Sequence, residues 1–322
     1  MISCLALTPK EPTDAWYDAR RKNKLISNQQ NMEKLKNQTI SISVSKHGAE
    51  LTSIKKGDIE YLWQADPTFW GRHSPVLFPI VGSLWEGRYR VGEKQYLLGQ
   101  HGFARDMDFT LLSHTDDSIS YRLDSDLQTM ESFPWPFALT ISYRLRDNEI
   151  DVSWEVENKG DETMYFQIGA HPAFNYPYYD PNSRARGYFS FDRSEGLECI
   201  KITEKGCVDT NARYYLETRA DGLYPLESDT FDSIDTLMLQ DGQLHRVTLH
   251  APDGNPWLSV LFDAPVVGLW SPPYKNAPFV CIAPWYGRCD RVGYSGQFSE
   301  RDWINSLAPG KNFKASYKII ID

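Results

Sequence analysis

The chain has 322 residues, of which 41% are hydrophobic, 13% aromatic and 24% charged, and its 43 acidic and 34 basic residues give a net charge of -9. The hydrophobic fraction is too high for a disordered chain, and no stretch approaches 18 consecutive apolar residues, so the sequence predicts no membrane span. An acidic chain has no overall electrostatic attraction to nucleic acid or anionic lipid. We therefore expect a soluble globular protein that handles a small molecule.

Residues 1–31 differ in character from the rest of the chain. They are polar, show no clean period and contain the basic run 20–24. Such a run can be a nucleic-acid arm, but we expect a flexible polar N-terminal extension, with the folded domain over 32–322. The start of the chain has no charged segment followed by a long apolar run, and the five cysteines have no CxxC spacing. We therefore expect a cytoplasmic protein without a disulfide framework or a zinc ribbon.

From residue 39 onward, the two-residue period of β-strands dominates. The stretch 137–145 is apolar at every second position, and the alternation resumes over 150–156 after the turn-like segment 146–149. This pattern predicts a β-hairpin with one buried face. Further strands are predicted, in chain order, at 39–44, 96–98, 118–123, 187–192, 245–250, 257–262, 266–270, 279–283 and 313–321.

The run 164–171 carries the most informative alternation. One face holds the apolar residues Met164, Phe166, Ile168 and Ala170, and the other holds Tyr165, Gln167, Gly169 and His171. Pro172 cannot donate to a strand ladder, so the strand must end there. We therefore predict that His171 ends a strand on the face opposite the apolar stripe, where a scaffold commonly positions functional groups.

Helices are expected to be few and short. Only 14–20, 126–132 and 299–306 have a suitable pattern. Many short strands separated by turn signals are typical of an all-β sandwich or barrel. The sequence therefore predicts one large all-β domain.

The usual catalytic motifs are missing. The seven histidines form no HxH or HExxH pair, and the chain has no GxSxG elbow, no GxGxxG opening a helix and no P-loop. We therefore predict neither a metal nor a cofactor. Two histidines nevertheless have unusual neighbours: His101 lies between Gly99 and Gly102, and His171 precedes Pro172. Taken singly, either one can also be a hydrogen-bonded structural residue.

Taken together, several segments resemble a known family. They are Phe78-Pro79-Ile80-Val81-Gly82, Gln100-His101-Gly102-Phe103-Ala104-Arg105, His171-Pro172-Ala173-Phe174-Asn175, Cys281-Ile282-Ala283-Pro284-Trp285 and Leu307-Ala308-Pro309-Gly310. In this order they resemble the aldose 1-epimerase (galactose mutarotase) family, and most closely its LacX-like branch, from about residue 38 to the C-terminus. The resemblance implies a galactose mutarotase-like β-supersandwich. It also implies a cofactor-free isomerase that interconverts the α and β anomers of a hexose or a hexose phosphate, as a monomer or weak homodimer.

The same resemblance implies roles for single residues. His171 would be the acid at the ring oxygen, and His101 would hydrogen-bond the same region. Five further residues would bind the sugar: Arg72 and Arg105 its hydroxyls or a phosphate, Asp235 its hydroxyls, and Phe174 and Trp285 its apolar faces. The alternatives are a structural ion pair for Asp235 and ordinary core packing for the two aromatic residues.

One departure from the family pattern concerns the catalytic base. The family typically has a glutamate just before the Pro-Trp pair, where this chain has Ala283. A methyl group cannot accept a proton, and loss of a general base costs about 10²–10⁴-fold in rate. Asp290 could supply a carboxylate, or it could form a salt bridge with its flanking arginines; Asp263 is a second candidate. Three functions therefore stay open: an aldose 1-epimerase, a carbohydrate-binding protein that has lost turnover, and an interaction module that binds no sugar.

Overall fold

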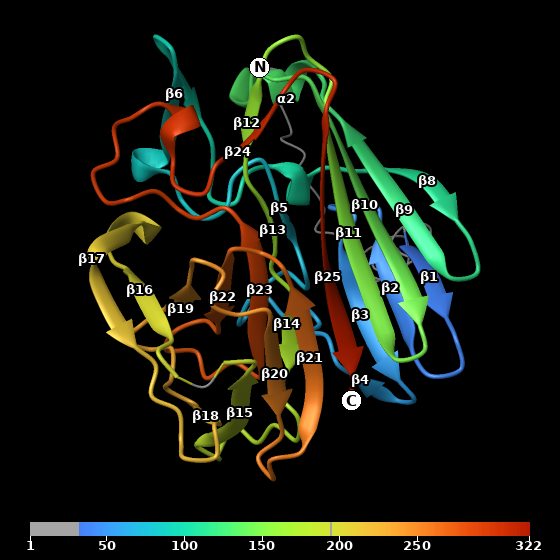
Figure 1. The fold of residues 1–322 in the computed structure, drawn as a ribbon. Helices are drawn as coiled ribbons and strands as arrows, with labels where there is room; N and C mark the ends of the chain where they lie inside the picture. Colours follow the sequence, from blue (N-terminus) through green and yellow to red (C-terminus); the bar gives the residue numbers. More distant parts are fainter. Residues whose placement is uncertain (1–31, 194) are drawn as a thin grey trace, which may run out of the picture. The chain divides into compact units, whose positions relative to one another are not determined.

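The structure is a computed structural model that describes residues 32–193 and 195–322, and strands dominate it (Figure 1). The predicted all-β fold is confirmed. Glu33–Asp322 form one compact unit. The expected N-terminal extension and the expected helix 14–20 lie outside the described residues.

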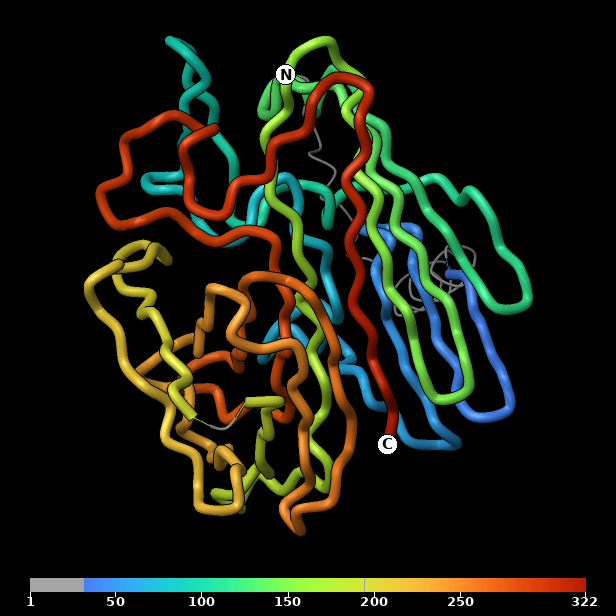
Figure 2. Tube along the Cα trace, viewed as in Figure 1, coloured from blue at the N-terminus to red at the C-terminus, as the bar shows by residue number. Residues whose placement is uncertain are grey.

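The larger of two main sheets has nine strands and is built around the predicted hairpin. Leu139 lies opposite Val156 and Tyr143 opposite Val152, so the apolar positions of the two hairpin strands share one face. In Figure 2 the last strand of the chain, in red, runs between segments from the middle and the later part of the sequence. The strand order is β18 (Tyr224–Glu227), β15 (Ala185–Phe191), β20 (Arg246–His250), β21 (Pro256–Phe262), β25 (Asn312–Ile321), β11 (Glu149–Asn158), β10 (Phe137–Arg146), β9 (Ser118–Asp124) and β8 (Thr110–His114).

The second main sheet has eight strands, and its central strands are buried on both faces. In β23, for example, every residue from Phe279 to Trp285 is buried. This double burial explains why the predicted strand 279–283 is a continuous apolar run rather than an alternating one. The strand order is β17 (Val208–Tyr215), β16 (Glu198–Ile202), β19 (Thr236–Leu239), β22 (Val266–Trp270), β23 (Phe279–Tyr286), β13 (Ile168–Ala170) and β5 (Val76–Leu77), with β14 (Ala173–Asn175) also paired to β23.

Three smaller sheets complete the described strands. They are the four-stranded sheet of β1 (Met32–Lys36), β2 (Ser41–Ser45), β3 (Leu51–Lys56) and β4 (Ile59–Glu60), the pair β12 (Met164–Phe166) and β24 (Asn305–Leu307), and the hairpin β6 (Arg88–Val91) and β7 (Lys94–Leu97).

The helix predictions had mixed outcomes. The helix predicted at 126–132 is present as α2 (Leu127–Ser132), because the Asp126 side chain accepts the Thr129 N–H and completes a capping box. The helix predicted at 299–306 is wrong. A single 3-10 turn, Phe298–Glu300, is followed by extended backbone at Arg301 and a left-handed residue, Trp303, with φ 58°, after which the chain enters β24. A non-glycine residue at positive φ cannot continue a right-handed helix.

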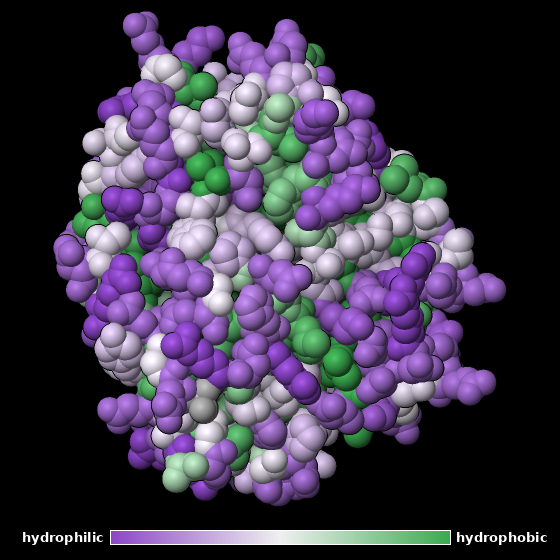
Figure 3. All heavy atoms as spheres, in the orientation of Figure 1, coloured by the Kyte–Doolittle hydropathy of each residue, from purple (hydrophilic) through white to green (hydrophobic). Residues whose placement is uncertain are grey.

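The two faces of the eight-stranded sheet have different partners. Ile282 of this sheet belongs to the same buried apolar cluster as Ile141 and Ile319 of the nine-stranded sheet, so this face forms the core. Ala283 and Trp285 point the other way and belong to a smaller cluster. The view in Figure 3 shows mostly hydrophilic side chains with small, separate apolar patches. The second face of the eight-stranded sheet is therefore where a site can form.

Candidate active site

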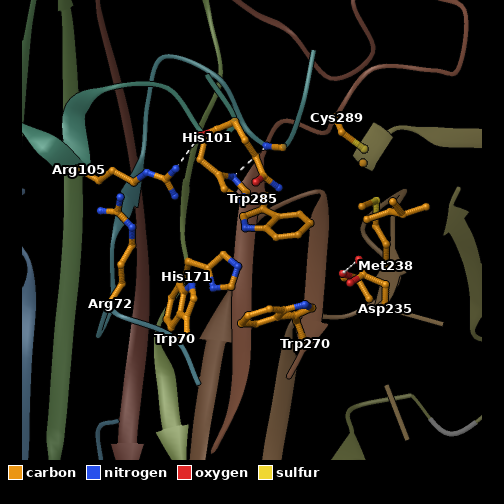
Figure 4. Close-up of a pocket in the computed structure, with 15 residues that line it drawn as sticks. Trp70, Arg72, His101, Arg105, His171, Asp235, Met238, Trp270, Trp285 and Cys289 are labelled. Carbon is orange, nitrogen blue, oxygen red and sulfur yellow. Dashed lines mark hydrogen bonds between the residues drawn. The ribbon is translucent and has the colours of Figure 1, made fainter. Parts of the chain in front are cut away.

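A cavity of about 310 Å³ lies over this second face (Figure 4). It brings together side chains from loops and strands that are far apart in the sequence. Its lining residues are Trp70, Arg72, Gly82, Gln100, His101, Arg105, His171, Ile202, Gly206, Asp235, Thr236, Met238, Trp270, Trp285 and Cys289.

His171 lies between two short strands that share one pairing register with β23. Gly169 pairs with Trp285 before it, and Ala173 pairs with Cys281 after it. The same antiparallel register therefore places His171 directly opposite Ala283. The predicted strand end at Pro172 agrees with the break between β13 and β14. His171 lines the cavity, but most of its side chain is buried, since His171 is only 7% exposed.

The floor beside His171 is flat and apolar because glycines make room for an indole. A Cβ atom on Gly169 would lie 2.5 Å from Cδ1 of Trp285, and one on Gly268 would lie 2.2 Å from its Cη2. The indole Nε1 donates to the Ala170 carbonyl at 3.0 Å, which fixes the ring. Ala283 pairs with Gly268 on the neighbouring strand, is fully buried and is not among the described residues that line the cavity.

A hydrogen bond from a backbone N–H to the imidazole of His101 determines which of its two ring nitrogens carries the proton. Its Nδ1 accepts the Gly82 N–H at 3.0 Å. It has a left-handed backbone with φ 66°, and a Cβ atom on the next residue, Gly102, would lie 2.2 Å from the Phe78 carbonyl oxygen. Burial, His171 and two nearby arginines hold the pKa of His101 well below its usual value. A neutral ring that accepts at Nδ1 has its proton on Nε2, so His101 can only donate into the cavity.

His171 is enclosed by aromatic rings. Ring centroids lie 5.0 Å away for Trp70, 5.4 Å for Trp270 and 5.6 Å for His101. Burial and the Arg105 charge lower the pKa of His171 to about 4, so its imidazole is neutral at pH 7. The buried Nδ1 has no hydrogen-bond partner among the described residues.

At the end of the cavity that holds His101 and His171, called the histidine end below, two arginines contact the same carboxylate, that of Asp106. Nη1 of Arg72 donates to Asp106 at 2.9 Å, and Nε of Arg105 lies 3.7 Å from the other oxygen of the same carboxylate. Nη2 of Arg105 donates to the Gln100 carbonyl at 2.7 Å. Burial and the neighbouring Arg72 lower the pKa of Arg105 to about 10. The Glu50 carboxylate, whose pKa is lowered by its hydrogen bonds to His73 and Ser74, also acts on Arg105, so two carboxylates offset the two guanidinium groups around this end of the cavity.

Asp235 is the only carboxylate among the described lining residues, and it lies at the far end. Residues that lie opposite one another on neighbouring strands form a row across the sheet, which consists of His171, Ala283, Gly268 and Met238. Met238 is three residues after Asp235 and three strands away from His171. Three strand spacings amount to about 14 Å between the first and last backbones of that row. Figure 4 shows Asp235 beyond Trp270, on the side away from His171. The Thr236 hydroxyl donates to the Asp235 carboxylate at 3.1 Å.

Two residues that we assigned to the site lie elsewhere. Phe174 is 0% exposed and packs in the main core, so no sugar can reach its ring. Asp290 is not among the lining residues: it accepts the Trp85 N–H at 2.8 Å and Nε of Arg301 at 2.5 Å. Both partners in this ion pair are nearly inaccessible, with 2% and 1% side-chain exposure. Asp290 therefore stabilises the fold around the cavity. Asp263, the second carboxylate candidate, is 96% exposed.

We expect Asp290→Asn to lower the free energy of unfolding by about 3–5 kcal/mol, because it leaves the Arg301 charge buried without a counter-charge. Asp263→Asn is the matched control and should change stability by less than about 0.5 kcal/mol. Urea unfolding of the two variants measures both changes. Equal stability of the two variants would contradict the structural role of Asp290.

The sequence prediction missed several lining residues. Trp70 and Trp270 flank His171, yet Trp70 lies in an irregular loop and Trp270 ends a strand whose residues are otherwise apolar. Neither position has a pattern that distinguishes a cavity wall from a core. No three or more His, Cys, Asp or Glu side chains of the described chain form a group that could hold a metal ion. None of the described helices is long and apolar enough to cross a membrane.

Comparisons with known proteins place these features in a family. A family model described as aldose 1-epimerase matches residues 33–319. The Lactococcus lactis protein LacX, in its plasmid form, is 32% identical over 298 residues, which cover 89% of this chain and 98% of that protein.

Two solved structures share both fold and sequence with this chain. A galactose mutarotase related enzyme from Lactobacillus acidophilus is 36% identical with a TM-score of 0.84, over 90% of this chain and 97% of that chain. A galactose mutarotase-like protein from Lactobacillus casei is 28% identical, also with a TM-score of 0.84, over 90% of this chain and all of that chain (100%). The predicted galactose mutarotase-like fold is thereby confirmed.

Proposed function

Since the chain belongs to the aldose 1-epimerase family, we propose that it interconverts the α and β anomers of a hexose by opening and closing the sugar ring. The observation that carries this proposal is the pair of histidine rings, His101 and His171, 5.6 Å apart at one end of the cavity. The reaction moves one proton from the anomeric hydroxyl to the ring oxygen and back. It needs proton-transfer groups and hydrogen-bond donors, and no cofactor.

The remaining side chains suit the binding of a pyranose. Trp285 and Trp270 present flat apolar faces to the cavity, which can pack against the C–H faces of a sugar ring. Nε2–H of His101 can donate to the ring oxygen. Asp235, at the far end, can accept hydrogen bonds from ring hydroxyls.

The two guanidinium groups of Arg72 and Arg105 in the cavity lining support a phosphorylated substrate. Guanidinium groups bind phosphate with paired, charge-assisted hydrogen bonds. We therefore expect Arg105→Gln to raise KM for glucose 6-phosphate by about 10- to 100-fold, and KM for glucose by no more than about threefold. Rates measured by polarimetry over a range of substrate concentrations give both constants. The control is Arg88→Gln, since Arg88 is 48% exposed, paired with Glu86 and absent from the cavity lining. Equal changes in the two constants would contradict a phosphate subsite at Arg105.

The second candidate function is a carbohydrate-binding protein without turnover. Ala283 favours it, because this residue lies opposite His171 and, among the described lining residues, the one carboxylate is at the other end of the cavity. A catalyst without its general base loses about 10²–10⁴-fold in rate, and free sugars already anomerise slowly in water.

Two measurements separate these functions. Polarimetry on freshly dissolved α-glucose, α-galactose and their phosphates should give a rate that rises in proportion to protein concentration. Calorimetry that detects saturable sugar binding, together with a rate equal to that of buffer for every sugar, would instead establish the binding function. If no sugar binds, both proposals fail and an interaction module is left.

Cytoplasmic location, the absence of a nucleic-acid partner, and a monomer or weak homodimer stay predictions. The four cysteines in the described residues, Cys199, Cys207, Cys281 and Cys289, are free and buried, which supports a reducing compartment.

A further inference from the structure

Among the described residues, the histidine end of the cavity contains several proton donors but only one side chain able to act as a base. Arg72 and Arg105 are charged donors without an acceptor, and Gln100 is an amide that does not take up protons. The hydrogen bond from Gly82 occupies Nδ1 of His101, which leaves His101 only its Nε2–H to donate. His171 differs, because it is neutral and its two ring nitrogens have different surroundings. Its Nδ1 is buried out of reach of a sugar and has no partner among the described residues, so Nε2 is the ring nitrogen that can face the cavity.

The one carboxylate among the described lining residues, Asp235, belongs to the loop before β19, three strands across the sheet from β13. Asp235 precedes β19, whereas His171 lies next to β23, with β22 between them. The anomeric oxygen and the ring oxygen are bonded to the same carbon atom, so two groups that act on them must converge on one point. The residue opposite His171 is Ala283, which is fully buried and offers only a methyl group.

We propose that His171 alone carries the proton between the anomeric hydroxyl and the ring oxygen, and that Asp235 takes no part in the transfer. This inference rests on the proposed function. It assigns base and acid to one imidazole, where the resemblance implied a separate base and gave His171 the role of acid.

The step balances on the sugar and one side chain. His171 removes the proton of the anomeric hydroxyl, the O–H electron pair forms the C1=O double bond, and the C1–ring oxygen bond breaks with its electrons on the ring oxygen. The imidazolium then returns the same proton to that oxygen. Because both oxygens are bonded to C1, one ring nitrogen can serve them in turn. After rotation about the C1–C2 bond, the same transfers run in reverse and close the ring as the other anomer.

The surroundings of His171 suit both halves of this transfer. The Nε2–H of His101 and the Arg105 charge can stabilise the negative charge that develops on the sugar oxygens. The same positive charge and the burial that keep His171 neutral also make its protonated form a strong proton donor. The charged or titratable groups that face His171 are Arg105, with Arg72 behind it, and His101; its other ring neighbours, Trp70, Trp270 and Trp285, do not titrate.

The pH dependence of kcat should show a single limb. A base must be neutral to accept a proton, so kcat should fall as pH drops through the pKa of His171, near 4, and stay level from about pH 5 to 8. His101 stays neutral over this range, and Arg105 stays charged because its pKa is about 10. Two groups with opposite protonation requirements would instead give a bell-shaped profile.

The deciding experiment compares wild-type protein with Asp235→Asn in mixtures of H₂O and D₂O, with glucose and glucose 6-phosphate as substrates. We expect Asp235→Asn to raise KM by about 10-fold, through lost hydrogen bonds to hydroxyls, and to keep kcat within about threefold. The wild-type rate should fall linearly with the deuterium fraction, because one proton moves in the rate-limiting step. A kcat that falls 100-fold or more in Asp235→Asn, or a curved deuterium dependence, overturns the one-histidine transfer and leaves the proposed function standing. A wild-type protein that does not accelerate anomerisation of either sugar overturns both.

Discussion

Replacing His171 by alanine should lower kcat for anomer interconversion by about 10²–10⁴-fold, the usual effect of removing a proton-transfer group. KM should change much less, because the tryptophans, the arginines and Asp235 still bind the sugar. Polarimetry at saturating substrate measures kcat directly. The expected loss is large because no other described lining residue near position 171 can accept a proton.

Two controls separate lost chemistry from lost structure. His245→Ala removes a histidine that is 58% exposed in its side chain and outside the cavity lining, and it should keep the wild-type rate. Added imidazole can enter the space vacated in His171→Ala, between Trp70 and Trp270, and should restore part of kcat. A merely structural histidine would show no such rescue. A His171→Ala variant that is folded and keeps wild-type kcat would rule out His171 as the proton carrier.

Introducing a glutamate at position 283 should have the opposite effect. Ala283→Glu places a carboxylate opposite His171, on the face of β23 that also carries Trp285. A separate base would leave His171 free to act on the ring oxygen, and we expect kcat to rise by about 10²–10⁴-fold, the contribution of a general base. Polarimetry on the same sugars measures the gain.

Ala283→Gln is the matched control, since it has nearly the same size and shape as the glutamate variant but cannot take up a proton. It should give no increase in kcat. Both variants must show the circular dichroism and saturable sugar binding of the wild-type protein, because a buried carboxylate costs stability unless it is paired. A folded, sugar-binding Ala283→Glu protein that is no faster than Ala283→Gln would show that position 283 does not reach the reacting bond.

Much of the fold could be predicted from the sequence, because local pattern determined it. Strands with one buried face, such as β10 and β11, alternate strictly, and the ends of the predicted hairpin strands differ from the observed ones by at most two residues. Short edge or irregular strands such as β5 and β14 carry two or three residues and no measurable period. The segment 299–306 was misassigned because the positive φ of Trp303 is set by its tertiary surroundings, which residue pattern does not record.

The site was predictable where backbone chemistry marked it. His101 and His171 could be found because glycine and proline beside a histidine indicate an unusual backbone. Ion pairing could not be found in this way. The arginines that flank Asp290 in the sequence, Arg288 and Arg291, pair with Asp302 instead, and Asp290 pairs with Arg301, eleven residues away. Which partners meet depends on how the loop after β23 folds back.

Exchange between the two anomers, observed at equilibrium by two-dimensional NMR, tests the central claim most directly. The anomeric proton resonances of glucose and of glucose 6-phosphate are recorded with and without the protein. We expect exchange cross-peaks between the α and β resonances of at least one sugar to grow in proportion to protein concentration. Cross-peaks no stronger than in buffer for either sugar, at protein concentrations that saturate with sugar in calorimetry, would contradict catalysis and identify the protein as a sugar binder.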